Sequence, residues 1–551
     1  MSHDTLYNGI RLPAQWPPCN MDPSSREPMP VPYLDSPPQV VPIDVGRQLF
    51  VDEFLIESTT LKRVFHTANK YEGNPILVPE TETEQEHPAA TACPFDDGVA
   101  YDPVTKKFML WYIASFPGHT ALAFSNDGLH WQRPDLDILP GTNVILPHDF
   151  PNRSRDSFCP LLDLNAQDPS ERFKAYLYVR HGKLKQPGER ISENWLLTSG
   201  DGVYWTHMAQ FGARGADGTT IHYNPFRQKW VMNLKYENRG MRGRAYIERD
   251  QFHDFGNLRE ATPEEAQRQV RSLNEPVQGL SEGQVLWVGA DRLDPPDPEW
   301  VVQDPTQLYM LEVVPYESIM LGVFAIHYGP HNNICEKGKF PKLTQIMIGY
   351  SRDGFHWHRP DRAPFIGATK NQGDWDRAYL RPAAGCIIAR DRLHFYYSGF
   401  SGVSPSGIRD MYAGGSTHVA SVRLDGFVSM DAGMEPRELV TRPLTFEGSH
   451  MFVNLDAPNG ELRVEALDQE GRIIEPLSIE RCTPVSGDGT CMPIRWRDGG
   501  NLSKAVGRPT RFRFQLTNGS LYSFWVTSDP GGKSHGYVAS GGPGFNGPKD
   551  S

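Results

Sequence analysis

The sequence predicts an all-β protein, a five-bladed β-propeller followed by a β-sandwich, and three repeated segments are the main reason. Segments 125–131, 199–205 and 351–357 share the pattern Ser-x-Asp-Gly-x-x-Trp. The second interval between them is close to twice the first, which indicates a degenerate copy within a regular series. A relaxed copy at 421–426 extends that series. Four short strands in each unit of this length are typical of propeller blades.

Short strands and turns account for the rest of each repeat. The Asp-Gly pair predicts a tight turn with positive φ at glycine, and the tryptophan predicts a wedge between neighbouring units. Segments 99–112, 220–232 and 385–397 are rich in aromatic and β-branched residues, which favours hairpins. Counting the first strand of each unit gives starts near residues 97, 156, 217, 304 and 381, and therefore five blades.

Shifts in composition divide the rest of the chain. Residues 1–43 are rich in proline and are expected to form an extended arm. The propeller is assigned to residues 44–435, with an inserted helix at 262–273 predicted from a capping box. Alternating stretches without the repeat assign 436–528 to the β-sandwich, and residues 529–551, rich in Gly and Ser, to a flexible tail. The sandwich is expected to pack on the propeller and to supply no catalytic group.

Composition argues against several classes of function. The 551 residues carry a formal charge of −12, so a basic surface for nucleic acid or an anionic membrane is not expected. No apolar run approaches the ~20 residues that span a bilayer. The N-terminus lacks the pattern of a secretory signal, which predicts a cytoplasmic protein, or an exported one if a signal has been removed. The seven cysteines include no CxxC pair, which disfavours a disulfide framework or a zinc knot. Assembly into a homo-oligomer stays open.

Carboxylates and arginines stand at several of the predicted blade starts. The first strands of the blades line a central funnel, so their polar side chains are expected to converge there. Glycoside hydrolysis requires two or three carboxylates around one sugar carbon. The candidates for catalysis are Asp97, Asp156, Asp217 and Glu317, and those for substrate binding are Arg155, Gln307, Trp375, Arg377 and Arg381.

Each candidate also has a structural interpretation. Asp97 and Asp217 each precede a glycine and suit a turn. Arg155 and Asp156 are neighbours that suit an ion pair on the channel wall. Glu317 lies on a predicted strand, where a solvated or salt-bridged side chain is the simpler interpretation.

With these residues in place, the chain resembles the five-bladed glycoside hydrolases of the family 32, 43, 68 and 117 group, especially the family 32 N-terminal type. Asp97 and the Arg155-Asp156 pair match the aspartate of blade one and the Arg-Asp pair of blade two. The resemblance implies a third acidic residue on blade three, where Asp217 stands in place of glutamate. It also implies a carbohydrate substrate and no cofactor, with a calcium ion on the propeller axis as an option.

The leading hypothesis is a glycoside hydrolase. Asp97 acts in it as nucleophile or base, Asp156 orients and stabilises the charged sugar, and Asp217 or Glu317 is the general acid. A phosphorylase or transglycosidase is the first alternative, because Arg155, Arg377 and Arg381 suit a phosphate clamp. A non-catalytic glycan-binding propeller is the second, because a fold does not determine a function.

Overall fold

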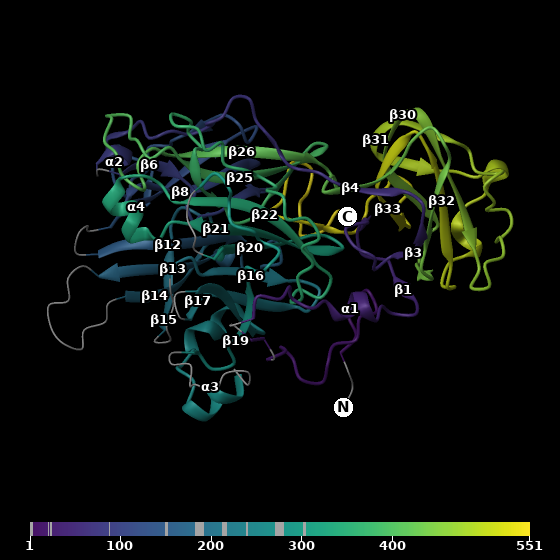
Figure 1. The fold of residues 1–551 in the computed structure, drawn as a ribbon, viewed down its shortest axis with the longest axis horizontal. Helices are drawn as coiled ribbons and strands as arrows, with labels where there is room; N and C mark the ends of the chain where they lie inside the picture. Colours follow the sequence, from purple (N-terminus) through teal and green to yellow (C-terminus); the bar gives the residue numbers. More distant parts are fainter. Residues whose placement is uncertain are drawn as a thin grey trace.

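The computed structural model is a mostly β protein with two packed units, a larger one at the left of Figure 1 and a smaller one at the right. It describes residues 4–19, 21–22, 25–86, 89–148, 153–181, 192–211, 217–238, 241–269, 280–300 and 305–551.

The larger unit is built from antiparallel meanders that follow one another along the chain. Meander 1 contains β6 (Ala89–Cys93), β7 (Val99–Asp102), β8 (Lys107–Phe116), β9 (His119–Ser125), β10 (Trp131–Gln132) and β11 (Val144–Leu146). Meander 2 contains β12 (Arg153–Leu162), β13 (Phe173–His181), β14 (Ser192–Ser199) and β15 (Thr206–Phe211). Meander 3 contains β16 (Thr220–Asn224), β17 (Lys229–Asn238), β18 (Met241–Arg249) and β19 (Val285–Gly289).

Two further meanders complete this unit, and the last is joined to the first. Meander 4 contains β20 (Gln307–Glu317), β21 (Ile319–Gly329) and β22 (Leu343–Ser351). Meander 5 contains β23 (Ala378–Pro382), β24 (Ile387–Ala389), β25 (Arg392–Phe400) and β26 (Gly415–Arg423), with β5 (Asn69–Lys70) paired to β26. Strand β26 also pairs with β6 in parallel, so meanders 1 and 5 share one sheet.

The repeated turns have the predicted geometry. In each, the serine Oγ accepts a bond from the glycine N–H, and the aspartate Oδ1 accepts bonds from the next two backbone N–H groups. The glycines have the required positive φ, for example +78° at Gly128.

Each repeated turn also binds the preceding meander. Tyr396 of meander 5 donates to Gly128 O at 2.8 Å, and Trp111 of meander 1 donates to Gly202 O at 2.9 Å. Trp287 of meander 3 donates to Phe355 O at 2.7 Å in meander 4. The relaxed copy follows the same rule, because Tyr316 of meander 4 donates to Asp425 at 2.7 Å. The repeat therefore fixes how consecutive meanders pack.

The smaller unit is a nine-stranded sheet that folds over its own core. Its strands run β3 (Ile56–Thr59), β28 (Arg437–Thr441), β32 (Arg511–Thr517), β30 (His450–Leu467), β33 (Gly519–Thr527), β27 (Val428–Ala432) and β4 (Lys62–Phe65), with β2 (Gln48–Leu49) on β33 and β31 (Val485–Ile494) on β30. The first half of β30 pairs with β33 and its second half pairs with β32, so this strand joins two layers. Alternate residues of β32 are buried in the core between them.

This unit extends beyond the predicted boundaries of 436–528. Strands β2, β3, β4 and β27 belong to its sheet, although the sequence places residues 44–435 in the propeller. The propeller assignment is therefore wrong at both of its edges. These strands carry no repeat motif, and they pair with sequence-distant partners that local patterns do not reveal.

The N-terminal arm packs along both units. Its short helix α1 (Pro32–Asp35) is followed by β1 (Val41–Pro42), which pairs in parallel with β29 (Leu444–Thr445). The ring of Tyr7 stacks on Phe226 with centroids 4.3 Å apart, and Trp16 lies edge-on to Phe355 at 5.4 Å. The arm therefore covers meanders 3 and 4, and Figure 1 shows it below the junction of the two units.

The C-terminal segment does not form the expected flexible tail. Strand β34 (Tyr537–Val538) pairs with the end of β20, and Val538 is buried. Ser540 bonds through its backbone to both Cys386 and Tyr101 at 3.0 Å. These backbone bonds fix a segment whose Gly- and Ser-rich composition alone suggests disorder.

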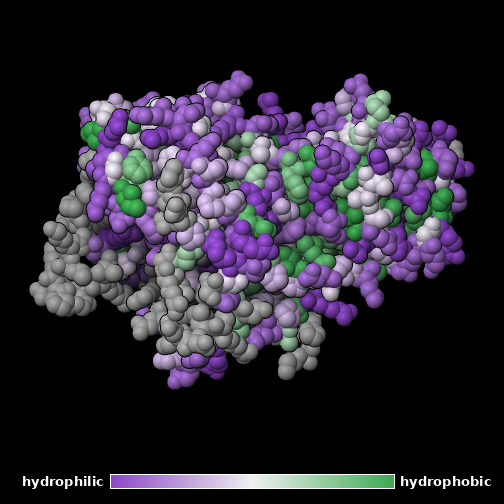
Figure 2. Space-filling view, viewed as in Figure 1, coloured by the Kyte–Doolittle hydropathy of each residue, from purple (hydrophilic) through white to green (hydrophobic). Residues whose placement is uncertain are grey.

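The helices are short. Helix α3 (Pro263–Gln269) begins with the predicted capping box, in which Thr262 N donates to Glu265 at 2.9 Å, and the remainder of the predicted 262–273 helix lies outside the described residues. The other helical segments are α2 (Glu82–Gln85), α4 (Asn332–Gly338), η1 (Pro169–Glu171), η2 (Phe252–Asn257), η3 (Arg497–Gly499) and η4 (Leu502–Lys504). In the described part of the chain no helix is long and apolar enough to cross a membrane. The face drawn in Figure 2 is mostly hydrophilic, with scattered hydrophobic residues.

Candidate functional site

A chain of polar contacts links the first strands of meanders 5, 1, 2 and 3. Arg381 at the start of meander 5 forms an ion pair with Asp96, which lies between β6 and β7 of meander 1. Ser157 of meander 2 donates to Asp96, and its Oγ accepts a bond from the N–H of Gly218 at 2.6 Å. Gly218 immediately precedes meander 3, so four consecutive meanders meet through buried groups.

The same chain closes on itself through meander 4. Arg244 of meander 3 donates both to Gly218 O and, at 3.4 Å, to the backbone oxygen of Tyr309 in β20. The hydroxyl of Tyr379 in meander 5 donates to the Tyr309 hydroxyl at 3.4 Å and accepts a bond from Arg381 at 2.8 Å. The contacts therefore form a closed ring that passes once through every meander.

Asp97 and Arg155 form a buried ion pair within this ring. Both side chains have an exposed fraction of 0%. Arg155 donates to the Asp97 carboxylate from both Nη atoms, with Nη2 at 2.8 Å from Oδ2. Burial raises the pKa of Asp97 to about 7, although Arg155 opposes that shift. As both groups are enclosed and paired, the predicted role of Asp97 as a nucleophile has no support in its placement.

Asp156 and Asp217 form a second, more accessible pair of carboxylates. Both contact Nη2 of Arg180, at 3.2 Å for Asp217, and Lys235 donates to Asp217 at 2.6 Å. The side chain of Asp217 is 26% exposed and that of Arg180 is 51% exposed. Asp156 is the more deeply buried of the two carboxylates. This pair is the most accessible of the predicted catalytic carboxylates.

The environments of these two carboxylates push their pKa values apart. Burial and the neighbouring Asp217 raise the pKa of Asp156 to about 6, while Arg180 lowers it. Burial also acts to raise the pKa of Asp217, but Lys235 and Arg180 outweigh it and the pKa falls below its ordinary value. Two interacting carboxylates with pKa values separated in this way suit one acid and one base.

The separation of the two carboxylates is limited by Arg180. Both Oδ2 atoms contact the same nitrogen, so they lie within about 6 Å of each other. A second cationic cluster lies around Tyr309. Lys342 donates to the Tyr309 hydroxyl at 2.9 Å, and the guanidinium of Arg242 lies 4.9 Å from the centroid of the Tyr309 ring. The site therefore combines two ionisable carboxylates with several cations.

Glu317 lies far from this site, which corrects its assignment as a candidate general acid. It is the last residue of β20, ten residues after Gln307. Extended chain rises about 3.3 Å per residue, which separates the two residues by roughly 33 Å. Glu317 instead accepts bonds from Arg47 N at 3.0 Å and Ser534 Oγ at 2.7 Å, next to the smaller unit. The structural interpretation, a buried salt-bridged glutamate, is the one that its contacts support.

The predicted substrate-binding residues divide into two groups. Arg155 and Arg381 are buried and bound to Asp97 and Asp96, which leaves two of the three arginines of the predicted phosphate clamp occupied. Gln307 is buried and accepts a bond from Arg242 N at 3.2 Å, so it holds the backbone of Arg242 in place.

Trp375 and Arg377 lie before β23, outside the ring. Trp375 is exposed, and the guanidinium of Arg377 lies 6.0 Å from the ring centroid of Trp300. In the described part of the chain no hydrogen bond or ion pair joins these two residues to the carboxylates. The start predicted at residue 304 falls outside the described residues.

Sequence reasoning missed several residues of the site. They are Asp96, Ser157, Arg180, Lys235, Arg242, Arg244, Tyr309, Lys342 and Tyr379. Arg180 lies on β13 one pairing step from Arg155, since Ser154 faces Arg180 across the two strands. The hairpins predicted from the sequence do not include β12 and β13, so the sequence did not place Arg180 beside the carboxylates. Among the described residues no group of three or more His, Cys, Asp or Glu side chains is arranged to hold a metal ion.

Comparison with known proteins yields only distant likenesses. No family model and no curated protein matches the chain. Among solved structures, it is similar to an N-acetylgalactosamine deacetylase from F. plautii in complex with blood group B trisaccharide, at 14% identity and a TM-score of 0.43, over 66% of this chain and 96% of that chain.

Two fructofuranosidases are also similar. The enzyme from Schwanniomyces occidentalis complexed with fructose has 10% identity and a TM-score of 0.35, over 88% of this chain and 98% of that chain. The β-fructofuranosidase of Bombyx mori has 10% identity and a TM-score of 0.35, over 85% and 94%. The chain thus has a mostly β structure with a distant likeness to carbohydrate-active enzymes.

Proposed function

We propose that the chain is a glycoside hydrolase in which the five meanders are the blades of a propeller around one axis. The closed ring of contacts supports this arrangement, because it passes through each meander once in sequence order. The shared sheet of meanders 1 and 5 supports it as well, since a propeller must join its last blade to its first.

The observation that carries the proposed activity is the Asp156–Asp217 pair. In it, Asp217 is the ionised nucleophile, because Lys235 and Arg180 hold its pKa below the ordinary value despite burial. Asp156 is the general acid, because burial and Asp217 raise its pKa to about 6 and keep a protonated fraction near neutral pH. Arg180 forms ion pairs with both carboxylates.

In the first step Asp217 attacks the anomeric carbon and the glycosidic C–O bond breaks. Asp156 gives its proton to the leaving oxygen, and a covalent glycosyl-enzyme forms. In the second step Asp156 takes a proton from water, which attacks the same carbon and releases Asp217. Carboxylates about 5–5.5 Å apart are typical of this retaining mechanism, and those of inverting enzymes are about 6.5–9.5 Å apart.

Asp97 and Arg155 have a positioning role in this proposal. Arg155 immediately precedes Asp156 in β12, and its bidentate pair with Asp97 holds that strand start against meander 1. Breaking the pair would leave one buried charge without a partner, which is strongly destabilising. The two residues therefore fix the acid without contacting the sugar.

The experiment that tests the proposal is a screen with activated aryl glycosides, followed by the stereochemistry of the product. 2,4-Dinitrophenyl furanosides and pyranosides of common sugars are incubated with the full chain, and the anomer first released is observed by proton NMR. We expect hydrolysis with retention, and loss of activity in the Asp156→Asn and Asp217→Asn variants. Inversion would contradict the nucleophilic role of Asp217, and undiminished activity in both variants would contradict the site.

A further inference from the structure

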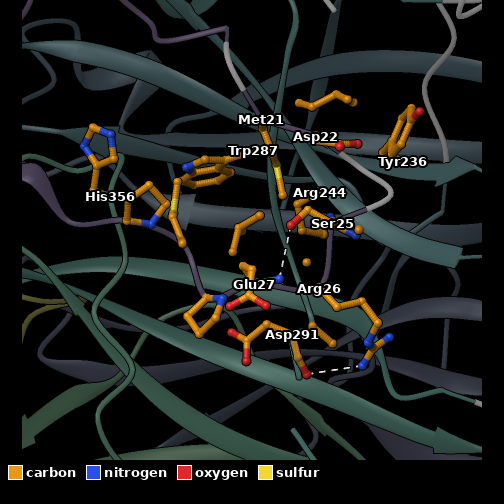
Figure 3. Close-up of a pocket in the computed structure, with 18 of the residues that line it drawn as sticks. Met21, Asp22, Ser25, Arg26, Glu27, Tyr236, Arg244, Trp287, Asp291 and His356 are labelled. Carbon is orange, nitrogen blue, oxygen red and sulfur yellow. Dashed lines mark hydrogen bonds between the residues drawn. The ribbon is translucent and has the colours of Figure 1, made fainter. Parts of the chain in front are cut away.

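A cavity of 510 Å³ lies between the N-terminal arm and meanders 3 and 4 (Figure 3). Its volume is within the range of about 300–1,000 Å³ that is usual for small-molecule sites. Met21, Arg26 and Glu27 of the arm form one wall. Arg242, Arg244 and Trp287 from strands β18 and β19 form the opposite wall.

The arginines of this cavity are bound by neutral groups. Arg26 donates to the backbone oxygens of Thr306 and Asp291 at 3.2 Å each, and the second of these bonds is drawn in Figure 3. Arg244 donates to Asn233 Oδ1 at 2.7 Å and to backbone oxygens. Among the described residues neither arginine forms an ion pair.

Arg242 contacts Tyr309 and keeps part of its side chain accessible. Among the described residues its ion-pair partner is Glu237, at 3.9 Å, which is beyond hydrogen-bond distance. Its side chain is 16% exposed, whereas that of Arg244 is enclosed.

The carboxylates of the cavity, in contrast, are paired with cations. Glu27 accepts a bond from Arg292 at 2.8 Å, and Asp291 pairs with Arg362 at 2.9 Å. Neither of these two arginines is among the residues that line the cavity. Asp22, a third carboxylate of the wall, also has an interaction of its own. Arg26 and Arg244 are thus bound by neutral groups, whereas Glu27 and Asp291 are paired with arginines from outside the cavity.

The positive charge of the cavity extends to the carboxylate site. Arg242 lies over the ring of Tyr309, and Arg244 bonds to the backbone of Tyr309 and Gly218. Burial acts to raise the pKa of Tyr309, but Lys342 and Arg242 lower it to about 8. Nearby positive charges and the hydrogen bond from Lys342 both favour the phenolate, so this shift is consistent with the arrangement of charges.

We propose that this cavity binds the anionic group, a carboxylate or a sulfate ester, of the glycan that Asp156 and Asp217 cleave. A guanidinium pairs with either group through parallel hydrogen bonds. Arg242 is the anchor, and Arg26 and Arg244 contribute charge. The identification of the ligand as a glycan rests on the proposed function, whereas the preference for an anion rests on the cavity alone.

Calorimetric binding to matched probes tests this proposal. The probes are trigalacturonate with its neutral methyl ester, and galactose 6-sulfate with galactose, which separate a carboxylate from a sulfate ester. We expect at least one anionic probe to bind more than tenfold tighter than its neutral partner. Arg26→Gln and Arg242→Gln should each reduce that preference at least fivefold, and Arg242→Lys less. Arg437→Gln, on the exposed surface of the smaller unit, is the matched control.

The outcomes separate this inference from the proposed function. Equal or undetectable binding within both pairs of probes would overturn it, whether or not the protein hydrolyses glycosides. A preference for the anion that survives in both Arg26→Gln and Arg242→Gln, with unchanged melting temperatures, would also overturn it. If no aryl glycoside is hydrolysed but the preference for the anion is lost in both variants, the cavity is confirmed as an anion site and the proposed hydrolase activity is contradicted.

Discussion

Strand β20 has a cluster of charged groups near each of its ends, and the two clusters differ in burial. Near the start of the strand, Asp156 and Asp217 share Arg180, whose side chain is half exposed. At its end, Glu317 and Asp425 share Arg47, and all three are buried. Burial raises the pKa of Asp156 to about 6 and that of Glu317 to about 7.

The comparison shows that a perturbed pKa does not by itself identify a site. Glu317 also accepts bonds from Ser534 Oγ and Arg47 N, so its carboxylate is held by the segments that join the two units. Asp217 keeps an exposed fraction of 26% and shares an exposed cation. Two features in addition to the pKa distinguish the candidate active site from the structural cluster. Its carboxylate is accessible to solvent, and the cation that binds it is exposed.

The largest expected effect separates the two clusters by turnover. In the proposed mechanism, Asp217→Asn removes the negative charge that attacks the sugar, and we expect kcat to fall at least about 10³-fold. Glu317→Gln keeps the shape of a group remote from the carboxylates, and kcat should remain within about twofold of the wild type. Initial rates on the best aryl glycoside, normalised to folded protein by circular dichroism, measure both. Comparable losses in the two variants would show that the clusters are not functionally distinct.

The next effect separates them by stability. Arg47→Ala leaves Glu317 and Asp425 buried without their shared cation, which typically costs about 3–5 kcal/mol. Arg180→Ala removes a cation that is half exposed, and Asp217 keeps its bond from Lys235, so the cost should be smaller, about 1 kcal/mol or less. Urea unfolding monitored by tryptophan fluorescence measures both changes. An Arg47→Ala variant as stable as Arg180→Ala would remove the structural role of the Glu317 cluster.

The third effect concerns the pH dependence of the active pair. The proposed mechanism requires Asp217 ionised and Asp156 protonated, so kcat/KM should fall as pH rises through the pKa of Asp156, about 6. Arg180 lowers that pKa, so Arg180→Gln should move the alkaline limb to higher pH, by about one unit. Glu317→Gln should leave the limb in place. If the alkaline limb does not move in Arg180→Gln, it reports the titration of a group other than Asp156.

The same comparison explains what the sequence predicts and what it does not. Asp97, Asp156, Asp217 and Arg381 are brought together as expected, because repeated first strands begin at one end of the fold and the repeat gives their spacing. The assignment of Glu317 fails because Glu317 lies at the far end of the strand that begins at Gln307. The length of an extended strand separates it from the other candidates.

Other parts of the site and fold depend on pairings that no local pattern encodes. Lys342 reaches Tyr309 from the third strand of meander 4, and Arg180 reaches Asp156 from the second strand of meander 2. The strands β2, β3 and β4 pair with residues more than 300 positions later in the chain. The cavity depends on where the proline-rich arm lies, which composition does not specify.

The smallest expected effect compares two copies of the repeated turn. Asp127 and Asp353 accept the same pair of backbone bonds, at 2.9 Å from Leu129 and His130 and at 2.9 and 2.8 Å from Phe355 and His356. Asp127 is half exposed, whereas Asp353 is 2% exposed. Water replaces the lost carboxylate in Asp127→Ala, but in Asp353→Ala the backbone N–H groups stay buried without an acceptor, which costs about 1–3 kcal/mol. We therefore expect Asp353→Ala to lower the free energy of unfolding by about 1 kcal/mol more than Asp127→Ala in matched urea titrations. Equal losses would mean that the turn stabilises the meanders through its shape rather than through buried hydrogen bonds.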